Sequence, residues 1–574
     1  NEQLWCCVQR VIILRLFSEA ICITDMMKRN MHSFNILLAI FSLKTNEVLS
    51  FSPWPLPTSY SIGSDSVSLS NEFEFSLQGD ASMSQVLQEA VIRYETLIRS
   101  SSSSSSITDN DLEMCTINVN EVLTNNEINS LILNVNESYT LSIMNSSSCT
   151  IIAETCWGAL HAMETFTQLL MNIEDNGNNG DDSSIMTTML SNLPIFISDS
   201  PRFSHRGFMI DTSRHFIPIN FIKHIIDSLT YNKLNVLHWH MVDAQSFPIK
   251  SMNEKSDLLY KGAYTSSLTY SLNDINNITK YAGMRGVRLV LEIDVPGHAA
   301  SWGDGYPNIM ADCEVKYSYN INDFALNPIL DDTYEVIGGL LSDLIIALNV
   351  SSTSSTSSLS SPVTIHLGGD EVVYGCWAND SSITSYMNLN NIDSYDQLLG
   401  YFVTTAQQLA KSIGFASTTQ WEEVFNAGLA DTVDSNTIFQ VWYSEDNIKA
   451  ITSAGFQTIA SPNEYWYLDI TTSSWDVMYD YDPSVGLTGE ELSNLIGGET
   501  AMWGEHVDEF NFDAVVHMRS EAVAERLWSI SAQGVTSDSD PTVMERLMEH
   551  RCRLMNRGVH SMPLQPGYCQ NNWV

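Results

Sequence analysis

The most restrictive feature of this 574-residue chain is a series of eight short apolar runs after residue 200, separated by stretches with helical periodicity. The runs are GFMIDTS (207–213), NVLHWHMVD (235–243), VRLVLEIDVPG (287–297), VTIHLGGDE (363–371), FASTTQW (415–421), TIFQVW (437–442), QTIASP (457–462) and LIGGETAMWGE (495–505). Strands that alternate with helices indicate a parallel sheet with helical crossovers. Eight such units favour a closed (β/α)8 TIM barrel, which takes about 250 residues or more. We therefore expect this α/β barrel at 201–574.

The pattern before residue 200 differs and predicts a smaller α+β domain at 51–200. A strand-like run, YTLSIM (139–144), precedes a helix-like run, WGALHAMETFTQLLM (157–171). From Met26 the chain reads MMKRNMHSFNILLAIFSL, a basic start followed by a short apolar run, as in a secretory signal. We expect residues 1–50 to be a signal or processed segment. The alternative is a buried N-terminal helix.

Polar and aromatic residues stand at the carboxyl ends of the predicted barrel strands. They are Asp211, Arg214, Asp243, His298, Asp370, Glu371, Trp421, Trp442, Trp503 and Glu505. In a TIM barrel this end of the strands builds the active site. The predicted pocket combines the indoles and Tyr467 with carboxylates, including Asp469, and the guanidinium of Arg206. Aromatic faces with carboxylates and a guanidinium suit a sugar, because its C–H faces stack on the rings and its hydroxyls are held by the charged groups. The formal net charge of −41 argues against nucleic acid or an anionic membrane as a partner.

Two of these acids, Asp370 and Glu371, are neighbours in the chain. Neighbouring residues of an extended strand point to opposite sides, so they cannot form the two flanking carboxylates of an ordinary glycosidase. If Glu371 protonates the leaving oxygen, the carbonyl oxygen of a 2-acetamido group on the substrate can act as the nucleophile. Asp370 would then hold the acetamido N–H. Substrate-assisted glycosidases are an exception to the two-carboxylate scheme.

Seven motifs follow one another along the chain in a fixed order. They are RGFMIDTSRHF (206–216), LHWHMVDAQSFP (237–248), EIDVPGHAASWG (292–303), HLGGDEV (366–372), QWEEVF (420–425), WYLD (466–469) and GGETAMWGE (497–505). In this order they resemble the β-N-acetylhexosaminidases of glycoside hydrolase family 20, in particular the eukaryotic lysosomal and secreted branch. The resemblance covers nearly all of 51–574. It implies an exo-acting, retaining enzyme that removes terminal N-acetylglucosamine or N-acetylgalactosamine through an oxazoline intermediate, with no cofactor and no metal.

The resemblance also implies catalytic roles for five residues. Glu371 would be the general acid and then the general base. Asp370 would orient the acetamido group, and Tyr467 would hydrogen-bond its carbonyl oxygen. Asp243 and His298 resemble the pair that tunes the acid.

Substrate-binding roles follow from the same resemblance. The walls of the acetamido pocket would be Trp421, Trp442 and Trp503. Arg206 would bind the 3- and 4-hydroxyls, while Asp469 and Glu505 would bind the 4- and 6-hydroxyls. In the lysosomal branch, one subunit type has an acid at the place of Asp469 and prefers neutral sugars. Another has an amide followed by Arg and accepts 6-sulfated sugars.

The chain departs from the family motif at one place, and two alternative functions have to be weighed. Many relatives have Asp-Asp where this chain has Asp243-Ala244, and we assign the role to Asp243 because relatives also vary at the second place. The HWH run (238–240) resembles the metal-binding H-x-H of amidohydrolases, but that site needs further histidines on later strands, and the predicted strands five to eight have none before His506. A barrel that binds sugar without cleaving it would lack the acid, and Glu371 is present.

Cysteines and N-x-S/T sequons are typical of a secreted or lysosomal/vacuolar protein. By resemblance, Cys313 would pair with Cys376 and Cys552 with Cys569. Of Cys115, Cys149 and Cys156, at least one is unpaired within the chain. An extended segment between Cys149 and Cys156 would hold those two too far apart to bond, so a third bridge, if there is one, involves Cys115. Five sequons predict glycosylation at Asn136, Asn145, Asn277, Asn349 and Asn379. We expect glycan substrates with terminal β-N-acetylhexosamine, no nucleic-acid partner, no membrane span and possible homodimers, as in many relatives.

Overall fold

A computed structural model describes residues 52–101, 111–121, 131–175, 185–313, 320–348 and 363–569. The predicted signal segment 1–50 and the sequon at Asn349 lie outside the described residues. Of the other sequons, Asn136, Asn145 and Asn277 are exposed and Asn379 is half-buried.

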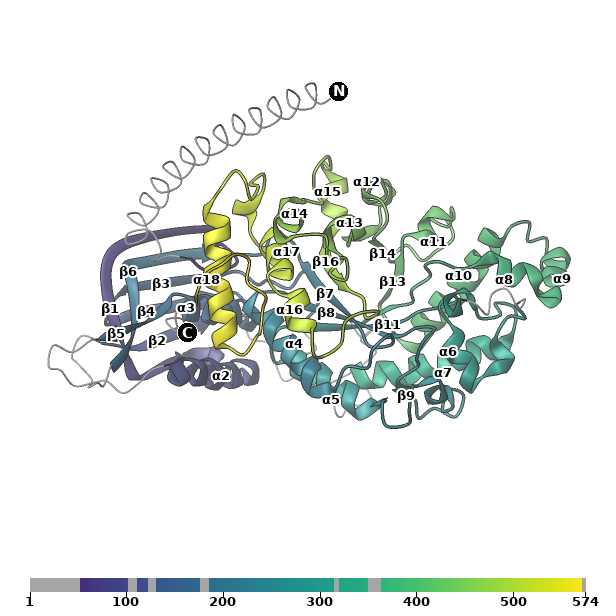
Figure 1. The fold of residues 1–574 in the computed structure, drawn as a ribbon, viewed down its shortest axis with the longest axis horizontal. Coiled ribbons are helices and arrows are strands. Elements are labelled where there is room, and N and C mark those ends of the chain that lie inside the picture. Colours follow the sequence, from purple (N-terminus) through teal and green to yellow (C-terminus); the bar gives the residue numbers. More distant parts are fainter. Residues whose placement is uncertain are drawn as a thin grey trace, which may run out of the picture. The chain divides into compact units, whose positions relative to one another are not determined.

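The first unit of the fold is built on a six-stranded sheet in the order β1-β2-β4-β3-β6-β5 (Figure 1). Its strands are β1 (Ser59–Leu77), β2 (Leu112–Val119), β3 (Tyr139–Asn145), β4 (Ser148–Ala153), β5 (Leu170–Asp175) and β6 (Ile185–Asp199). β1 pairs with β6 along its first half and with β2 along its second. The helices α2 (Gln85–Ser101) and α3 (Cys156–Gln168) accompany this sheet. This is the smaller α+β unit predicted ahead of the barrel.

The helix predicted at 157–171 is shorter than expected. α3 ends at Gln168, and the chain then enters β5, where Leu170 pairs with Leu190 of β6. The apolar pattern LLM fits a buried strand as well as a buried helix, so hydrophobicity alone did not locate this boundary.

The second unit is a closed barrel of eight parallel strands in the order β11-β12-β13-β14-β15-β16-β7-β8. The strands are β7 (His205–Asp211), β8 (Val236–Val242), β11 (Arg288–Ile293), β12 (Thr364–His366), β13 (Ser417–Trp421), β14 (Ile438–Val441), β15 (Gln457–Ala460) and β16 (Leu495–Met502). Each falls within or overlaps one of the eight predicted runs, and the TIM barrel is confirmed. A minor sheet pairs β9 (Ile249–Lys250) with β10 (Tyr270–Ser271).

Helices of very different lengths join these strands or follow the last of them. They are α4 (Ile219–Tyr231), α5 (Leu272–Gly283), α6 (Ala300–Gly305), α7 (Asp331–Leu348), α8 (Tyr374–Asn379), α9 (Ser381–Asn390), α10 (Tyr395–Ile413), α11 (Glu423–Asn426), α12 (Glu445–Ser453), α13 (Asn463–Trp466), α14 (Trp475–Asp480), α15 (Glu490–Asn494), α16 (Phe512–Val516), α17 (Arg519–Trp528) and α18 (Thr542–Asn556). Short 3-10 turns lie at η1 (Gly79–Met83), η3 (Leu259–Gly262), η4 (Pro307–Ile309), η6 (Ile321–Asp323) and η7 (Ile530–Ala532). No helix in the described ranges is both long and apolar enough to cross a bilayer.

The main core lies between the barrel strands and the surrounding helices. In α4, Ile222, Ile225, Ile226 and Leu229 recur at helical spacing and are buried in this core. In β8, Trp239 belongs to the same core, while the histidines on either side of it point into the barrel, because side chains alternate along a strand.

The C-terminal helix α18, yellow in Figure 1, lies beside α3 of the first unit. Arg557, just after α18, forms an ion pair of 2.7 Å with Glu164 of α3, and both side chains are buried. Three disulfides join Cys115 to Cys149, Cys313 to Cys376 and Cys552 to Cys569. The two bridges implied by the resemblance are therefore present, and Cys115 forms the third with Cys149.

Candidate active site

A cavity of about 180 Å³ opens at the carboxyl end of the barrel strands. It is lined by Arg214, His298, Asn322, Asp370, Glu371, Trp421, Trp442, Tyr467, Asp469, Trp503 and Glu505. Nearly all of these residues follow or end a barrel strand, as the TIM-barrel fold predicts for an active site. The structure thus brings together nine of the eleven residues for which the sequence predicts catalytic or substrate-binding roles. Asp243 lies just behind the cavity, and Arg206 lies elsewhere.

Arg206 is the second residue of β7, so it lies at the amino end of the strand, roughly 16 Å from the carboxyl end. It is fully buried, and its guanidinium donates to both carboxylate oxygens of Glu137 at 2.6 and 3.0 Å. It also donates to the carbonyls of Phe203 and Lys233. The prediction that Arg206 binds the sugar is therefore wrong: this residue ties the barrel to the first unit.

Arg214, three residues beyond the end of β7, is the guanidinium of the cavity. It contacts Asp211 at 3.1 Å and Asp243 at 2.7 Å, and Glu505 lies 3.8 Å away. Burial opposes its charge, but these carboxylates outweigh burial and raise the pKa of Arg214. Its guanidinium also lies over the Trp503 ring, 5.0 Å from the ring centre. Arg214 is thus held in place beside the aromatic walls.

Four aromatic side chains form the walls. Trp442 and Tyr467 stack at 6.3 Å, while Trp503 lies 6.2 Å from both Tyr467 and Trp421. Two indole N–H groups bond away from the cavity. Trp421 donates to Glu292 at 2.8 Å, and Trp442 donates to Glu423 at 3.0 Å. The rings therefore present apolar faces, which suit a methyl group or the C–H face of a sugar.

The turn after β12 separates the two neighbouring acids. Gly368 and Gly369 have φ angles of 66° and 97°, and a Cβ on Gly368 would lie 1.9 Å from the Asp294 carboxylate. Only glycine fits this close approach. Glu371 itself has a φ of 49°, a strained angle of the kind that collects at functional sites. The turn buries Asp370, which is 8% exposed, and leaves 57% of the Glu371 side chain exposed.

Asp370 is placed to accept a hydrogen bond from a ligand. Its Oδ1 atom is buried and has no hydrogen-bond partner among the described residues. Burial raises the pKa of Asp370. The neighbouring Asp294 is also buried, and burial together with the Asp370 charge holds the pKa of Asp294 well above its ordinary value. The two carboxyls therefore titrate as one coupled pair, in which ionisation of both at once is unfavourable.

Glu371 is linked to a buried charge pair. His298 Nδ1 lies 3.0 Å from Asp243 Oδ1, and His298 Nε2 lies 3.4 Å from Glu371 Oε2. Burial opposes a charge on His298, but Asp243 outweighs it and holds the pKa of His298 well above its ordinary value. The ion pair with His298 lowers the pKa of Glu371. The His298 ring thus orients the Glu371 carboxylate and stabilises its ionised form.

Asp469 and Glu505 line the side of the cavity next to Arg214. Burial and the charge of Glu505 raise the pKa of Asp469 to about 6. Asp469 Oδ1 is buried, with no partner among the described residues. Arg519 holds the segment around it by donating to the carbonyls of Leu468 and Ile470. This side therefore offers carboxylate oxygens to hydroxyl groups.

Two groups of acids and histidines have atoms close enough to surround a metal ion. They are His238 with Glu292 and His366, and Asp243 with Asp294 and His298. His238 faces Glu499 and Glu292 with its two ring nitrogens, and His298 faces Asp243 and Glu371. Burial opposes a charge on His238 and on His298, but the facing carboxylates outweigh burial and raise the pKa of both, which favours the protonated ring that has no lone pair for a metal. The geometry favours ion-pair networks at both places.

Comparison with known proteins decides the family. A family model described as "Glycosyl hydrolase family 20, catalytic domain" matches residues 203–531, and one described as "beta-acetyl hexosaminidase like" matches 53–169. The chain belongs to glycosyl hydrolase family 20. Beta-hexosaminidase 1 of Arabidopsis thaliana is 34% identical over 531 residues, which cover 90% of this chain and 92% of that protein. It follows that this chain is a glycoside hydrolase.

Two further relatives agree. Beta-hexosaminidase subunit beta of Homo sapiens is 35% identical over 429 residues, which cover 73% of this chain and 70% of that protein. The X-ray structure of Flavobacterium johnsoniae chitobiase superposes with a TM-score of 0.72 at 26% identity, covering 88% of this chain and 73% of that chain. The barrel and the smaller preceding domain are thus found in a solved family 20 structure of similar fold.

Several residues of this family 20 site escaped the sequence-based prediction. Asn322 reaches the cavity from η6, a loop with no periodic pattern, and accepts a hydrogen bond from Gln245 at 2.9 Å. Asp294 and Glu292 lie in the motif EIDVPGHAASWG, in which the sequence predicts a catalytic role only for His298. An acid inside an apolar strand is costly unless it is paired, and this signal could have identified Glu292.

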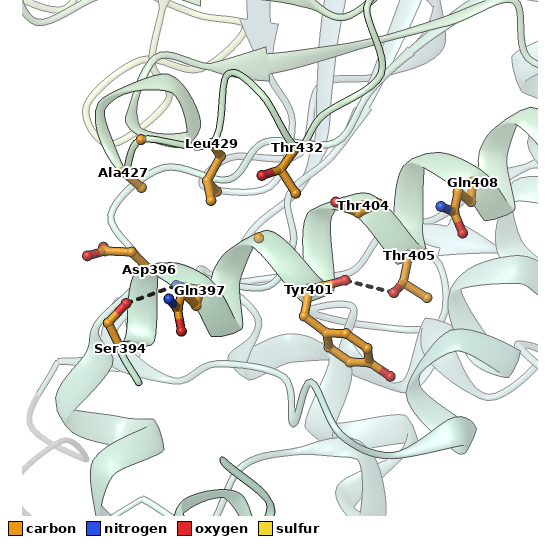
Figure 2. Close-up of a pocket in the computed structure, with 12 residues that line it drawn as sticks. Ser394, Asp396, Gln397, Tyr401, Thr404, Thr405, Gln408, Ala427, Leu429 and Thr432 are labelled. Carbon is orange, nitrogen blue, oxygen red and sulfur yellow. Dashed lines mark hydrogen bonds between the residues drawn. The ribbon is translucent and has the colours of Figure 1, made fainter. Parts of the chain in front are cut away.

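A larger hollow of about 660 Å³ lies along α10 and the segment 427–432 (Figure 2). Its polar groups mostly bond within their own helix. Ser394 accepts from the Gln397 amide, and Thr405 donates to the Tyr401 carbonyl. Asp396 accepts from Tyr374. These groups do not converge on a common point, so we place the family 20 active site in the smaller cavity at the barrel mouth.

Proposed function

We propose that this chain is an exo-acting β-N-acetylhexosaminidase that removes terminal, non-reducing N-acetylglucosamine or N-acetylgalactosamine with retention of configuration. The observation that carries the proposal is the buried, unpartnered Oδ1 of Asp370 beside the exposed Glu371 in an aromatic cavity. An acetamido group has an N–H for Asp370, a methyl group for the indole faces and a carbonyl oxygen that can attack C1. The relatives named beta-hexosaminidase and chitobiase support this substrate class.

In the first step, the acetamido carbonyl oxygen forms a bond to C1 as the bond from C1 to the leaving oxygen breaks. The electron pair of the broken bond goes to the leaving oxygen, which takes the proton of Glu371. The sugar becomes an oxazolinium ion, whose N–H faces the carboxylate of Asp370. A fixed negative charge at that position stabilises charge that exists only after cyclisation begins, so it accelerates the reaction. Tyr467 would hydrogen-bond the attacking carbonyl oxygen.

In the second step, water attacks C1 from the face that the leaving group left. Glu371, now ionised, takes a proton from this water. The bond from C1 to the acetamido oxygen breaks, and its electron pair restores the acetamido group. Two inversions at C1 give net retention. No carboxylate of the protein forms a covalent bond to the sugar in this scheme.

Glu371 has to carry a proton when the substrate binds. In the open site the ion pair with His298 lowers the pKa of Glu371. A sugar in the cavity would cover its exposed side chain, and burial raises the pKa of a carboxyl group. We therefore expect an acidic working pH, at which a useful fraction of Glu371 is protonated.

The small size of the cavity supports exo action. Its volume of about 180 Å³ is below the roughly 300–1,000 Å³ of sites for drug-sized ligands, and it suits a single sugar residue. The carboxylates of Asp469 and Glu505 would bind hydroxyls at the non-reducing end, and Arg214 would bind them from the β7 side. Among the residues that line the cavity, these groups close the side that binds the non-reducing end, so no further sugar fits there.

We further propose that the protein works in the secretory pathway, in a lysosome, in a vacuole or outside the cell. Three disulfides fit an oxidising compartment. Glycosylation at the exposed sequons and formation of homodimers stay predictions.

The experiment compares Asp370→Asn with the wild type on 4-nitrophenyl N-acetylglucosaminide. We expect kcat to fall far more than KM rises, because the Asp370 charge matters most in the transition state. The wild type should be nearly inert on the matching glucoside, which lacks the acetamido group. Equal activity on the two sugars would contradict the proposed function.

A further inference from the structure

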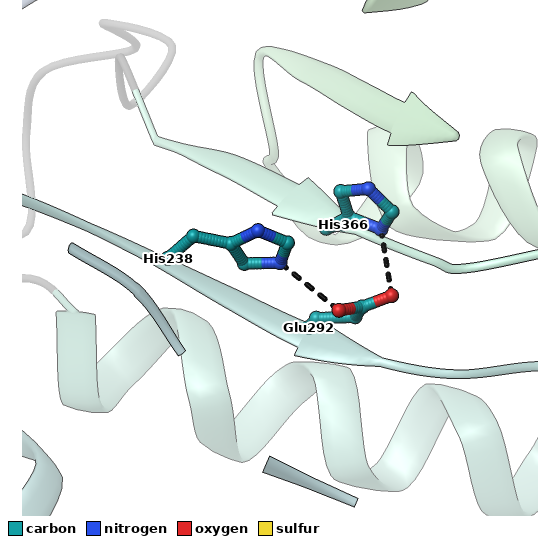
Figure 3. A group of neighbouring side chains, drawn as sticks. All are labelled: His238, Glu292 and His366. Atoms are coloured by element: carbon teal, nitrogen blue, oxygen red, sulfur yellow. Dashed lines mark ion pairs between the residues drawn. The ribbon is translucent and has the colours of Figure 1, made fainter. Parts of the chain in front are cut away.

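Glu292 is a fully buried carboxylate near the end of β11, inside the barrel and beneath the sugar cavity. Leu291 and Ile293, on either side of it, belong to the core between strands and helices. Strand alternation therefore turns Glu292 into the barrel interior. Figure 3 shows its carboxylate within ion-pairing reach of His238 and His366, at 3.0 and 3.2 Å. None of the roles proposed above uses this acid.

The two oxygens of Glu292 serve different parts of the site. Oε1 accepts the indole N–H of Trp421, a wall of the cavity, at 2.8 Å. Oε2 lies 2.6 Å from His240 Nδ1, and the other ring nitrogen of His240 lies 3.0 Å from Asp243 Oδ2. Asp243 then continues to His298, which reaches Glu371. One carboxylate thus connects an aromatic wall to the group that orients the acid.

Charge balance explains why this position holds an acid. His240 lies between Glu292 and Asp243 with both ring nitrogens engaged. Burial opposes its charge, but Glu292 outweighs burial and holds the pKa of His240 well above its ordinary value. A protonated imidazole donates from both nitrogens, so it needs an acceptor on each side. An amide in place of Glu292 could not accept from both His240 and Trp421 with separate oxygens.

We propose that Glu292 is a positioning residue that fixes Trp421 with one oxygen and, through His240 and Asp243, fixes His298 with the other. It sets the distance between the acetamido wall and the acid. The proposal rests on the function proposed above, because both ends of the connection act on the same bound sugar.

The direct test is Glu292→Gln, measured on 4-nitrophenyl N-acetylglucosaminide and on chitobiose. We expect kcat/KM to fall by about 10- to 100-fold, since a displacement of about 1 Å at a reacting group costs up to that much. The loss should be larger on chitobiose, whose leaving group needs the proton of Glu371. Equal, small losses on both substrates would overturn the proposal.

The matched control is Glu499→Gln. Glu499 is also a buried glutamate inside the barrel, paired with His205 at 3.0 Å and His238 at 2.7 Å. His238 also contacts Glu292, but Glu499 has no hydrogen bond to Trp421 or His240 among the described residues. It lines a separate cavity of about 200 Å³, together with residues from the amino ends of the strands. Glu499→Gln should lower the melting temperature about as much as Glu292→Gln does, without changing the ratio of kcat/KM on the two substrates. A similar change in that ratio would show a general effect of barrel damage and would overturn the proposal.

If Glu292→Gln does not fold, Glu292→Asp takes its place. It keeps the negative charge, but its side chain is one methylene shorter and cannot reach Trp421 and His240 together. We expect a melting temperature nearer to that of the wild type and a kcat/KM lower by about tenfold or more. Wild-type kinetics in a folded Glu292→Asp would overturn the proposal.

A double-mutant cycle tests the connection itself. Trp421→Phe removes the indole N–H but keeps an aromatic wall, and His240→Gln removes the imidazolium. Because both groups depend on one carboxylate, the double variant should deviate from the product of the single losses in kcat/KM by about threefold or more. The deviation should vanish in a Glu292→Gln or Glu292→Asp background. Its survival there would assign the coupling to another route, such as the Trp503 ring, which contacts both.

The outcomes separate the two proposals. A folded wild type with no activity on either substrate would contradict the proposed function. An active wild type whose Glu292 variants behave like the Glu499 control would overturn only the role of Glu292.

Discussion

Asp370 and Glu371 are adjacent in the chain, yet Asp370 is 8% exposed while the Glu371 side chain is 57% exposed. The glycine turn after β12 and the positive φ of Glu371 separate them. One acid therefore sits in the depth of the cavity and the other at its opening. This arrangement allows one carboxylate to hold a substrate group while the other exchanges protons with the leaving oxygen and with water.

The first prediction concerns Glu371 as the acid. Glu371→Gln should lose roughly 10²–10⁴-fold in kcat/KM on glycosides with poor leaving groups, which is the usual contribution of general acid catalysis. It should lose much less in the cleavage step on 2,4-dinitrophenyl N-acetylglucosaminide, because that phenolate leaves without a proton. Rates on a series of aryl glycosides measure this, and equal losses across the series would rule out Glu371 as the acid.

The second prediction separates Arg206 from Arg214. Lysine cannot reproduce the two-point contact of a guanidinium, so both Arg→Lys variants lose contacts. Arg206→Lys should lower the melting temperature with kinetic constants close to those of the wild type, because Arg206 contacts Glu137 far from the cavity. Arg214→Lys should lower kcat/KM by about tenfold or more, through displacement of Asp243 and of the substrate. The reverse result would restore the substrate-binding role predicted for Arg206.

These two arginines show which parts of the site could be predicted from the sequence and which could not. Strand periodicity located the barrel, and the strand ends located the cavity, including Arg214. The sequence nevertheless predicted Arg206, and not Arg214, as the guanidinium of the pocket, and the resemblance gave Arg206 the same role. The position of Arg206 at the start of β7 was available from the pattern and argued against it.

Other features depend on packing between distant segments. Cys115 and Cys149 pair because β2 and β4 are neighbours, which no local pattern reveals. Asn322 enters the cavity from a loop, and Glu292 lies within 3.2 Å of side chains from three other strands. Such contacts follow from the closed barrel, so they become visible only in three dimensions.

The third prediction concerns the ion pair between Glu137 and Arg206. Burial opposes ionisation of Glu137, but Arg206 outweighs it and lowers the pKa of Glu137 from 4.5 to about 2. A depressed folded-state pKa stabilises the protein above pH 4.5, and this contribution is lost as the pH falls towards 2. Glu137→Gln should therefore destabilise the fold by about 3–5 kcal/mol at pH 6, the usual cost of breaking a buried pair.

Denaturant unfolding from pH 6 down to pH 2.5 measures the effect. The wild type and the variant should converge towards the acid end, since protonated Glu137 resembles the amide. A constant difference over the whole range would show that the charge of Glu137 contributes nothing. The Glu137→Gln substitution keeps the sequon at Asn136 intact.

The fourth prediction concerns charge selectivity at the 6-position. A 6-sulfate next to ionised Asp469 places like charges together, which costs on the order of several kcal/mol. Because the pKa of Asp469 is raised to about 6, the preference for the neutral sugar should grow as the pH rises from 4.5 to 7. The double change Asp469→Asn, Ile470→Arg should narrow the preference and remove its pH dependence. The measurement is kcat/KM for neutral and 6-sulfated aryl glycosides, and equal rates in the wild type would show that Asp469 does not face this position.

The central claim is that the substrate's own acetamido oxygen is the nucleophile held by Asp370. It is tested most directly by kcat/KM on 4-nitrophenyl glucosaminides whose N-acyl methyl group carries zero, one, two or three fluorine atoms. Fluorine withdraws electrons from the carbonyl oxygen, so the account predicts a lower rate with each added fluorine, at a nearly constant size of the acyl group. Rates that do not change along this series, or a sugar trapped covalently on a carboxylate of the protein, would contradict the account.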